Sequence, residues 1–62
     1  MNKPEWLTPE EVAAWLAVTP VFLQNLRLDR TGPAYDVYGA GIVRYDRRIV
    51  DEWLTANTVS NP

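Results

Sequence analysis

The chain of 62 residues contains neither cysteine nor histidine. Without cysteine it forms no disulfide or thiolate metal site, and without histidine it lacks the commonest metal ligand and general base. Catalysis would then need paired carboxylates, a lysine or an activated hydroxyl group. The adjacent Glu10 and Glu11 diverge on a helix and do not form such a pair. We therefore predict a protein that is not an enzyme and that binds no metal, cofactor or small-molecule substrate.

Long apolar runs are missing as well. Charged residues or prolines interrupt every apolar stretch well before the roughly 20 residues that a membrane span needs. The first five residues show no basic start, apolar stretch or small-residue cleavage site of a secretory signal. We therefore expect no membrane partner and a cytoplasmic location.

The chain also has no surplus of basic side chains, since six Lys and Arg residues stand against eight Asp and Glu residues, a net charge of −2. The charge is unevenly distributed. Residues 19–48 hold five arginines and three aspartates, a surplus of two positive charges, while the segments on both sides are acidic. Nucleic-acid-binding surfaces usually carry a basic surplus. Any such surface of this chain is therefore expected in its middle.

The length permits one domain with one core, here residues 1–62. We expect order over about residues 6–56 and frayed ends at 1–5 and 57–62. The seven aromatic residues are numerous for this length. Because no disulfide or metal stabilises so small a core, their burial is expected to compensate. Trp6 and Trp53 are expected in the core, with a half-exposed position in a protein contact as the alternative.

The first helix is predicted from residue 8 to about residue 16. Thr8 and Glu11 have the spacing of a capping box, and Pro9 suits the first helical position because its missing N–H is not needed there. The apolar positions that follow recur at helical spacing. They are Val12, Ala13, Trp15 and Leu16.

The same Thr-Pro start recurs at Thr19, so the first helix must end at Ala17 and Val18. Two helices joined so closely cross steeply, which predicts a helix-turn-helix over residues 8–28. Ala17 either takes the left-handed conformation, at a cost of about 1–2 kcal/mol, or the turn stays right-handed. The residues expected between the helices are Leu16, Val18, Leu23 and Leu26.

Counting about 100° per residue along the second helix separates a buried side from an outward side. Arg30 is expected to return to the buried side with Leu23, and Gly32 to cap the helix in the left-handed conformation before Pro33. The outward side is the candidate reading surface. It comprises Val21, Gln24, Asn25 and Leu28, with Arg27 at its flank.

Two runs rich in β-branched and aromatic residues follow, at 34–38 and 42–45. They flank Gly39, Ala40 and Gly41, which predicts a hairpin with a short glycine loop. Asp46 is expected to cap a third helix from residue 47 to about residue 56.

This order of elements resembles the excisionase and AlpA-like group of small winged helix-turn-helix proteins, which are related to MerR-type DNA-binding domains. The resemblance covers roughly residues 6–55. The matching residues open the first helix, surround the turn, open and leave the second helix, and follow the hairpin. They are Leu7 to Ala13, Leu16, Val18, Thr19, Pro20, Gly32, Pro33, Arg44, Tyr45, Trp53 and Leu54.

The resemblance implies a mainly α fold with a small β-hairpin, a winged helix-turn-helix, that binds double-stranded DNA sequence-specifically. It implies an excisionase-type recombination directionality factor of a phage or mobile element, which assists a tyrosine or serine integrase in the nucleoid. A small transcription regulator of the same fold is one alternative, and a protein-interaction module that uses the fold without DNA is another. Because one copy meets little more than one major groove, an integrase partner or cooperative self-association on DNA is expected.

In that family the second helix enters the major groove, and the hairpin lies along the backbone or the minor groove. By position, the resemblance assigns the base contacts to the residues of the reading surface. Phosphate contacts fall to Arg27, Arg30 and Arg44, and the wing site comprises Gly39, Ala40 and Gly41 with Arg44 and Arg47. The two glycines either let the wing approach a sugar-phosphate backbone or serve the turn alone.

Two alternatives stay open for the polar residues. Gln24 and Asn25 either pair with adenine edges in the major groove or are merely solvated. Arg47 and Arg48 either contact phosphates or form ion pairs with Asp51 and Glu52 at helical spacing. We favour the ion pair for Arg48 with Glu52, and the phosphate contact for Arg44.

Overall fold

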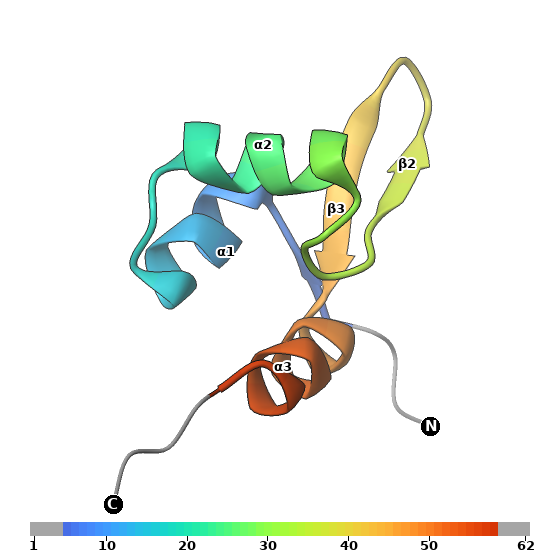
Figure 1. Cartoon of the computed structure of the whole chain (residues 1–62). Coiled ribbons are helices and arrows are strands. Elements are labelled where there is room, and N and C mark those ends of the chain that lie inside the picture. Colours follow the sequence, from blue (N-terminus) through green and yellow to red (C-terminus); the bar gives the residue numbers. More distant parts are fainter. Residues whose placement is uncertain (1–4, 59–62) are drawn as a thin grey trace, which may run out of the picture.

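The computed structural model describes residues 5–58, which form three helices and a three-stranded antiparallel sheet (Figure 1). In chain order these are β1 (Trp6–Leu7), α1 (Pro9–Leu16), α2 (Pro20–Asp29), β2 (Asp36–Tyr38), β3 (Ile42–Asp46) and α3 (Arg47–Ala56). The chain is thus mixed α/β, and its helix–hairpin–helix layout is compatible with the expected arrangement. No helix within residues 5–58 has the length and apolar character needed to cross a membrane.

Most of the predicted frayed ends, residues 1–4 and 59–62, lie outside the described residues. The remaining members of those ends are hydrogen-bonded. The carbonyl of Glu5 accepts from the backbone N–H of Arg47 at 3.0 Å, and the backbone N–H of Asn57 donates to the carbonyl of Trp53 at 3.0 Å. Hydrogen bonds within the domain therefore reach slightly beyond residues 6–56.

α1 begins with the predicted capping box. The Thr8 hydroxyl accepts from the Glu11 backbone N–H at 3.1 Å, and the Glu11 carboxylate accepts from the Thr8 backbone N–H at 2.8 Å. The hydrogen bond from the Thr8 backbone is the main cause that lowers the pKa of Glu11 below its ordinary value of 4.5. The hydrogen bond with the Thr8 side chain lowers this pKa further, desolvation opposes the shift, and the nearby Arg44 adds the weakest lowering effect.

The capping box predicts a specific pH dependence of stability. Because the pKa of Glu11 is lower in the folded chain than in the unfolded chain, its stabilising effect is complete above about pH 4.5 and is lost as the pH falls through the folded value. The melting temperature of Glu11→Gln, measured from about pH 6 to about pH 3, should therefore fall less steeply with decreasing pH than that of the wild type. Glu10→Gln is the matched control, since Glu10 caps nothing. Equal slopes for Glu11→Gln and the wild type would contradict the role of the carboxylate.

α1 and α2 are joined by the predicted tight turn. Ala17 takes the left-handed conformation, with φ 59° and ψ 41°, which decides between the two alternatives for this residue. The strain is accompanied by a hydrogen bond of 2.9 Å from the Val18 N–H to the Ala13 carbonyl, which closes the end of α1. Thr19 then caps α2 by accepting from the Phe22 backbone N–H at 3.0 Å.

The end of α2 differs from the prediction in two respects. Arg30, and not Gly32, is the left-handed cap, with φ 59°. Arg30 is also exposed rather than turned to the buried side. The physical reason is that the N–H groups of Arg30 and Thr31 bond back to carbonyls of the last turn, including Thr31 to Leu26 at 3.1 Å. The helix is therefore closed before Gly32 is reached.

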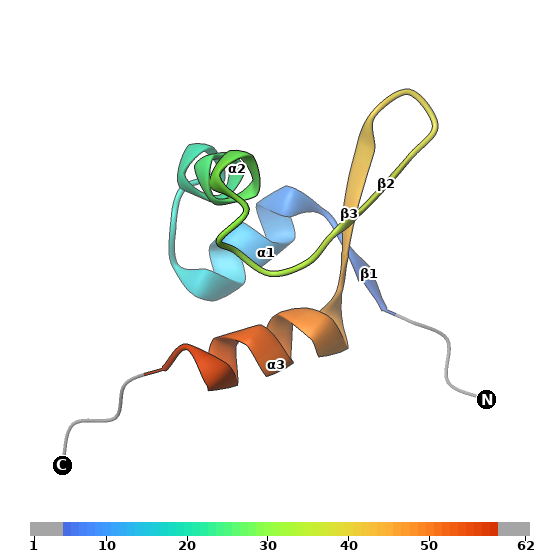
Figure 2. The ribbon, with the colours of Figure 1, turned by 45° about the vertical axis from the view of Figure 1, so that its right-hand side comes forward.

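The sheet contains a strand that the sequence did not predict. β3 lies in the centre, with β1 and β2 antiparallel on its two sides. β1 pairs with the end of β3, Leu7 opposite Tyr45, and β2 pairs with its beginning, Val37 opposite Val43. β1 has only two residues, which is too short for an alternating pattern to be recognised. It ends where Pro9 starts α1, and so it connects the predicted hairpin to the first helix (Figure 2).

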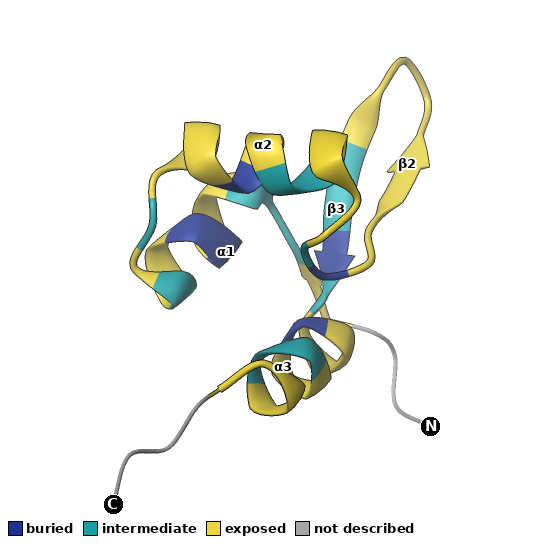
Figure 3. Ribbon diagram, viewed as in Figure 1, coloured by how far each residue is buried: buried dark blue, intermediate teal, exposed yellow. Residues whose placement is uncertain are grey.

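The core is mostly aliphatic, contrary to the expected burial of the aromatic rings. Its fully buried members are Val12, Ala13, Leu23, Tyr45 and Val50 (Figure 3). Among the seven aromatic residues only Tyr45 belongs to it, and Trp53 is half-buried. The other five are more than a third exposed; they are Trp6, Trp15, Phe22, Tyr35 and Tyr38. The expected contacts between the helices are present, because Leu16, Val18 and Leu26 pack against the core beside the buried Leu23.

Candidate nucleic-acid interface

The outward side of α2 is open to solvent as predicted. Leu23 is fully buried and orients the helix, so the residues on the opposite side point away from the core. Val21 and Leu28 are 64% and 73% exposed, and Gln24 and Asn25 are exposed between them. Two amides are thus presented beside two uncovered apolar side chains, which are the groups that can read adenine edges and thymine methyl groups.

The hairpin of β2 and β3 projects beyond the body of the domain. In Figures 1 and 2, α2 and the hairpin tip both lie at the upper side of the molecule, while α3 lies at the lower side. The tip carries Gly39, Ala40 and Gly41, all of them exposed. The structure therefore presents the predicted reading surface and the predicted wing on one side of the domain.

Arg27 is held in place by two tyrosines. Its Nη1 donates to the hydroxyl of the fully buried Tyr45 at 2.9 Å, and its guanidinium carbon lies 5.9 Å from the centre of the Tyr35 ring. The two tyrosine rings are themselves 6.0 Å apart, centre to centre. Because only one of the five guanidinium N–H groups is used in this hydrogen bond, Arg27 retains donors for a ligand in a fixed orientation.

Arg27 and Arg30 line an open depression at the C-terminal end of α2. Its volume is about 370 Å³, and the segment leading into β2 supplies the remaining lining, including Pro33 and Tyr35. Within residues 5–58, no side-chain hydrogen bond or ion pair engages Arg30. The depression therefore combines one oriented guanidinium with one that is unengaged, beside the reading surface.

Arg44 is placed differently from Arg27 and Arg30. It lies on β3 opposite Asp36, is half-buried, and donates from Nη1 to the carbonyl of Val43 at 2.7 Å. It is also close enough to Glu11 to lower the pKa of that carboxyl. Two carboxylates thus stand near Arg44, and its charge is at the base of the hairpin rather than at the tip.

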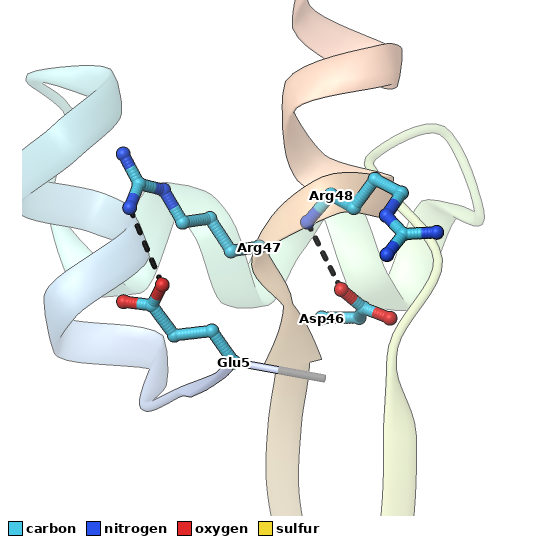
Figure 4. A network of polar contacts seen from close by, with 4 residues as sticks. All are labelled: Glu5, Asp46, Arg47 and Arg48. Carbon is cyan, nitrogen blue, oxygen red and sulfur yellow. Dashed lines mark hydrogen bonds and ion pairs between the residues drawn. The ribbon is translucent and has the colours of Figure 1, made fainter. Parts of the chain in front are cut away.

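Arg47 and Arg48 point to opposite sides of the end of β3 (Figure 4). Arg47 pairs with Glu5 at 3.3 Å, and its guanidinium carbon lies 5.8 Å from the centre of the Trp15 ring. This contact is on the α1 side of the domain, and the structure does not bring Arg47 to the reading surface. Both ion-pair partners are about 60% exposed, so water and salt weaken the attraction between them.

The favoured ion pair between Arg48 and Glu52 is not formed. Within residues 5–58, the one ion pair joins Arg47 and Glu5. The hydrogen bond that Arg48 does form uses its backbone N–H, which donates to the Asp46 carboxylate at 2.9 Å. The helix cap is therefore satisfied at Asp46, and the spacing of four residues between Arg48 and Glu52 does not by itself bring the two charges together.

Sequence reasoning missed the apolar residues that accompany this surface. Phe22 is 52% exposed near the start of α2, and Tyr38 and Ile42 are 52% and 42% exposed beside the hairpin tip. The alternation along the two strands was the available signal for Tyr38 and Ile42, since residues two positions apart share a face. Within residues 5–58, no group of three or more acidic side chains is arranged to hold a metal ion.

Comparison of the chain with protein-family models and with curated proteins finds no match.

Proposed function

We propose that the protein binds double-stranded DNA as a winged helix-turn-helix, with α2 in the major groove and the hairpin alongside the same duplex. The observation that carries this proposal is that α2 and the hairpin tip both lie on the side of the domain opposite α3. The arginine-lined depression adjoins the C-terminal end of α2. A duplex that contacts α2 would therefore pass the hairpin tip.

In this arrangement, different residues recognise the bases and bind the phosphates. Gln24 and Asn25 pair with base edges, because their amides match the donor and acceptor of adenine. Arg27 and Arg30 hold phosphates from the depression, and Arg44 adds a weaker contact from the base of the hairpin. Phosphate contacts supply most of the affinity, while base contacts supply the discrimination between sequences.

The resemblance to excisionase and AlpA-like proteins supports a narrower proposal. The protein would act as a recombination directionality factor that assists an integrase, or as a small transcription regulator of the same build. One α2 in one major groove gives modest specificity, so several copies on adjacent sites, or a partner protein, would complete the recognition.

A second candidate function is protein interaction without DNA. It is favoured by the first seven residues of α2, 20–26, which carry no charge and include the exposed Val21 and Phe22. An apolar helix face with few charges is typical of a protein contact. The two functions differ in their dependence on salt, because release of counterions accompanies DNA binding.

A salt titration on selected DNA tests the proposal. Duplexes enriched from a random-sequence library would be titrated by fluorescence anisotropy at several salt concentrations. If Arg27, Arg30 and Arg44 contact phosphates, log affinity should fall with log salt concentration with a slope of about −2.7. Arg30→Ala should make this slope less steep by about 0.9 on every duplex, and Asn25→Ala should relax the preference at one base pair.

Arg48→Ala is the matched control, since it removes the same charge from α3 and should leave the slope unchanged. Absent binding at low salt, or binding whose affinity does not depend on salt, would reject DNA binding and support the protein-interaction module. A uniform loss on all sequences for Asn25→Ala would reject its reading role.

A further inference from the structure

The reading surface of α2 is one narrow stripe. Its residues recur at the spacing i, i+3, i+4 and i+7, which places them within about 100° of one another around the helix. They are Val21, Gln24, Asn25 and Leu28, and all four are exposed, on the side of α2 that Figure 3 shows turned away from the core. At about 1.5 Å per residue the stripe is about 10 Å long, which corresponds to about three base pairs of DNA.

The two amides in this stripe have no partner within the domain. Among residues 5–58, no side-chain hydrogen bond engages Gln24 or Asn25. Other polar groups of this region are already engaged, since the Thr19 hydroxyl accepts from the Phe22 backbone N–H at 3.0 Å. Gln24 and Asn25 therefore present both a donor and an acceptor to whatever meets the reading surface.

The stripe contains no charged side chain. The charged residues of α2 are Arg27 and Asp29, and rotation of about 100° per residue places both of them outside the stripe. The guanidinium of Arg27 is moreover bonded to the hydroxyl of the buried Tyr45 at 2.9 Å. Arg and Lys make the paired contact with guanine, and Asp and Glu accept from cytosine. The stripe thus holds neither kind of residue that reads a G·C pair by charge.

An amide matches adenine because it carries one acceptor and one donor. Its oxygen accepts from the N6–H of adenine while its nitrogen donates to N7. Guanine presents two acceptors on the same edge, so the amide oxygen would face an acceptor there. The thymine of an A·T pair adds a C5-methyl group, which Val21 and Leu28 at the two ends of the stripe can cover. All four side chains therefore favour A·T pairs.

We propose that the reading surface recognises a run of about three A·T base pairs, and that N6-methylation of a contacted adenine breaks the contact. The inference rests on the proposed function, to which it adds a base composition and a means of regulation. In an A·T pair one N6 hydrogen bonds to thymine, so the methyl group replaces the other, which faces the major groove. That hydrogen is the one that the amide oxygen accepts. A methylated site is therefore bound weakly although its base sequence is unchanged.

Modified duplexes test the contact atom by atom. A duplex enriched from the random-sequence library would be synthesised with N6-methyladenine, or with 7-deazaadenine, which lacks the N7 acceptor. Either base at a contacted position should weaken binding about tenfold, within the range of a paired base contact, and leave the salt slope unchanged. Uracil in place of a contacted thymine should weaken binding about fourfold, because one methyl contact is lost. Leu28→Ala should reduce this effect of uracil.

Two protein variants assign the effect of methylation to the amides. The variant with both Gln24→Ala and Asn25→Ala should bind methylated and unmethylated duplexes equally, at a low salt concentration where phosphate contacts suffice. Both residues are exposed, so the fold is expected to be retained, and circular dichroism would verify it. Asn57→Ala is the matched control. It removes an exposed amide at the end of α3 and should keep the full sensitivity to methylation.

The outcomes separate this inference from the proposed function. Selected duplexes that require a G·C pair within the contacted run, or wild-type binding that N6-methyladenine does not weaken, would overturn the inference and leave DNA binding standing. Sensitivity to methylation that persists in the double variant would overturn it too, because another group would then be responsible. If the wild type binds no duplex at low salt, the proposed function fails, and the inference fails with it.

Discussion

Tyr45→Ala is expected to remove a large part of the domain's free energy of unfolding. Tyr45 is the largest fully buried side chain, and it packs with Val12, Leu23 and Val50. Truncation of a buried aromatic ring costs about 3–5 kcal/mol. At about 0.05–0.15 kcal/mol per residue, a domain of this length has only about 3–9 kcal/mol of stability in total. Urea denaturation followed by circular dichroism would measure the loss.

Tyr45→Phe separates the ring from its hydroxyl group. It keeps the packing and removes only the hydrogen bond to Arg27, so it should cost about 0.5–1.5 kcal/mol and leave the domain folded. Freed from that bond, Arg27 should also bind phosphate less well, because the remaining contact with Tyr35 holds it less firmly. A Tyr45→Ala variant that unfolds no more easily than Tyr45→Phe would show that the ring is not the centre of the core.

Gly32→Ala is expected to destabilise the domain by about 3 kcal/mol, at the upper end of the usual range for overpacking. A Cβ atom at Gly32 would lie 2.8 Å from the Cβ atom of Leu26. A Cβ atom has no rotamer freedom, so the contact can be relieved only if the backbone moves. The movement would separate the segment 32–35 from α2 and widen the depression lined by Arg27 and Arg30.

Gly39→Ala is the control for the clash at Gly32. Gly39 has a φ of 59°, and the nearest atom to an added Cβ, Cδ1 of Ile42, is at an ordinary 3.5 Å. The variant therefore introduces left-handed strain of about 1–2 kcal/mol without overlap. In a domain of this size each 1 kcal/mol lowers the melting temperature by roughly 4–8 °C, so the two variants should be distinguishable by thermal unfolding. Equal melting temperatures would contradict the close approach of Gly32 to Leu26.

The helix starts were predictable because they are local. Thr8, Thr19 and Asp46 each accept a hydrogen bond from a backbone N–H two or three residues later, so a short stretch of sequence contains both partners. The hairpin was predictable for a similar reason, since its two strands are separated by a loop of three residues. The outward side of α2 followed from the period of the helix, with Leu23 as its buried reference.

The contacts that decide the candidate interface join residues far apart in the chain. Arg27 is oriented by Tyr45, 18 residues away, and Arg47 is paired with Glu5, 42 residues away. Charge counts showed that arginines were concentrated in residues 19–48, but they did not show which of them face the reading surface. Local spacing favoured Glu52 as a partner of Arg48, and the tertiary structure does not form that pair.

The sequence by itself thus determined where the helices begin, where the hairpin turns and which side of α2 faces outward, because these depend on bonds and periodicities within a few residues. Only the tertiary structure decided that β1 joins the sheet, that five of the seven aromatic residues remain more than a third exposed, and that the missing side chain of Gly32 leaves space for Leu26. These features depend on how separate elements share a small volume. In so short a chain, aliphatic side chains and a single tyrosine fill the core, and most rings are left on the surface.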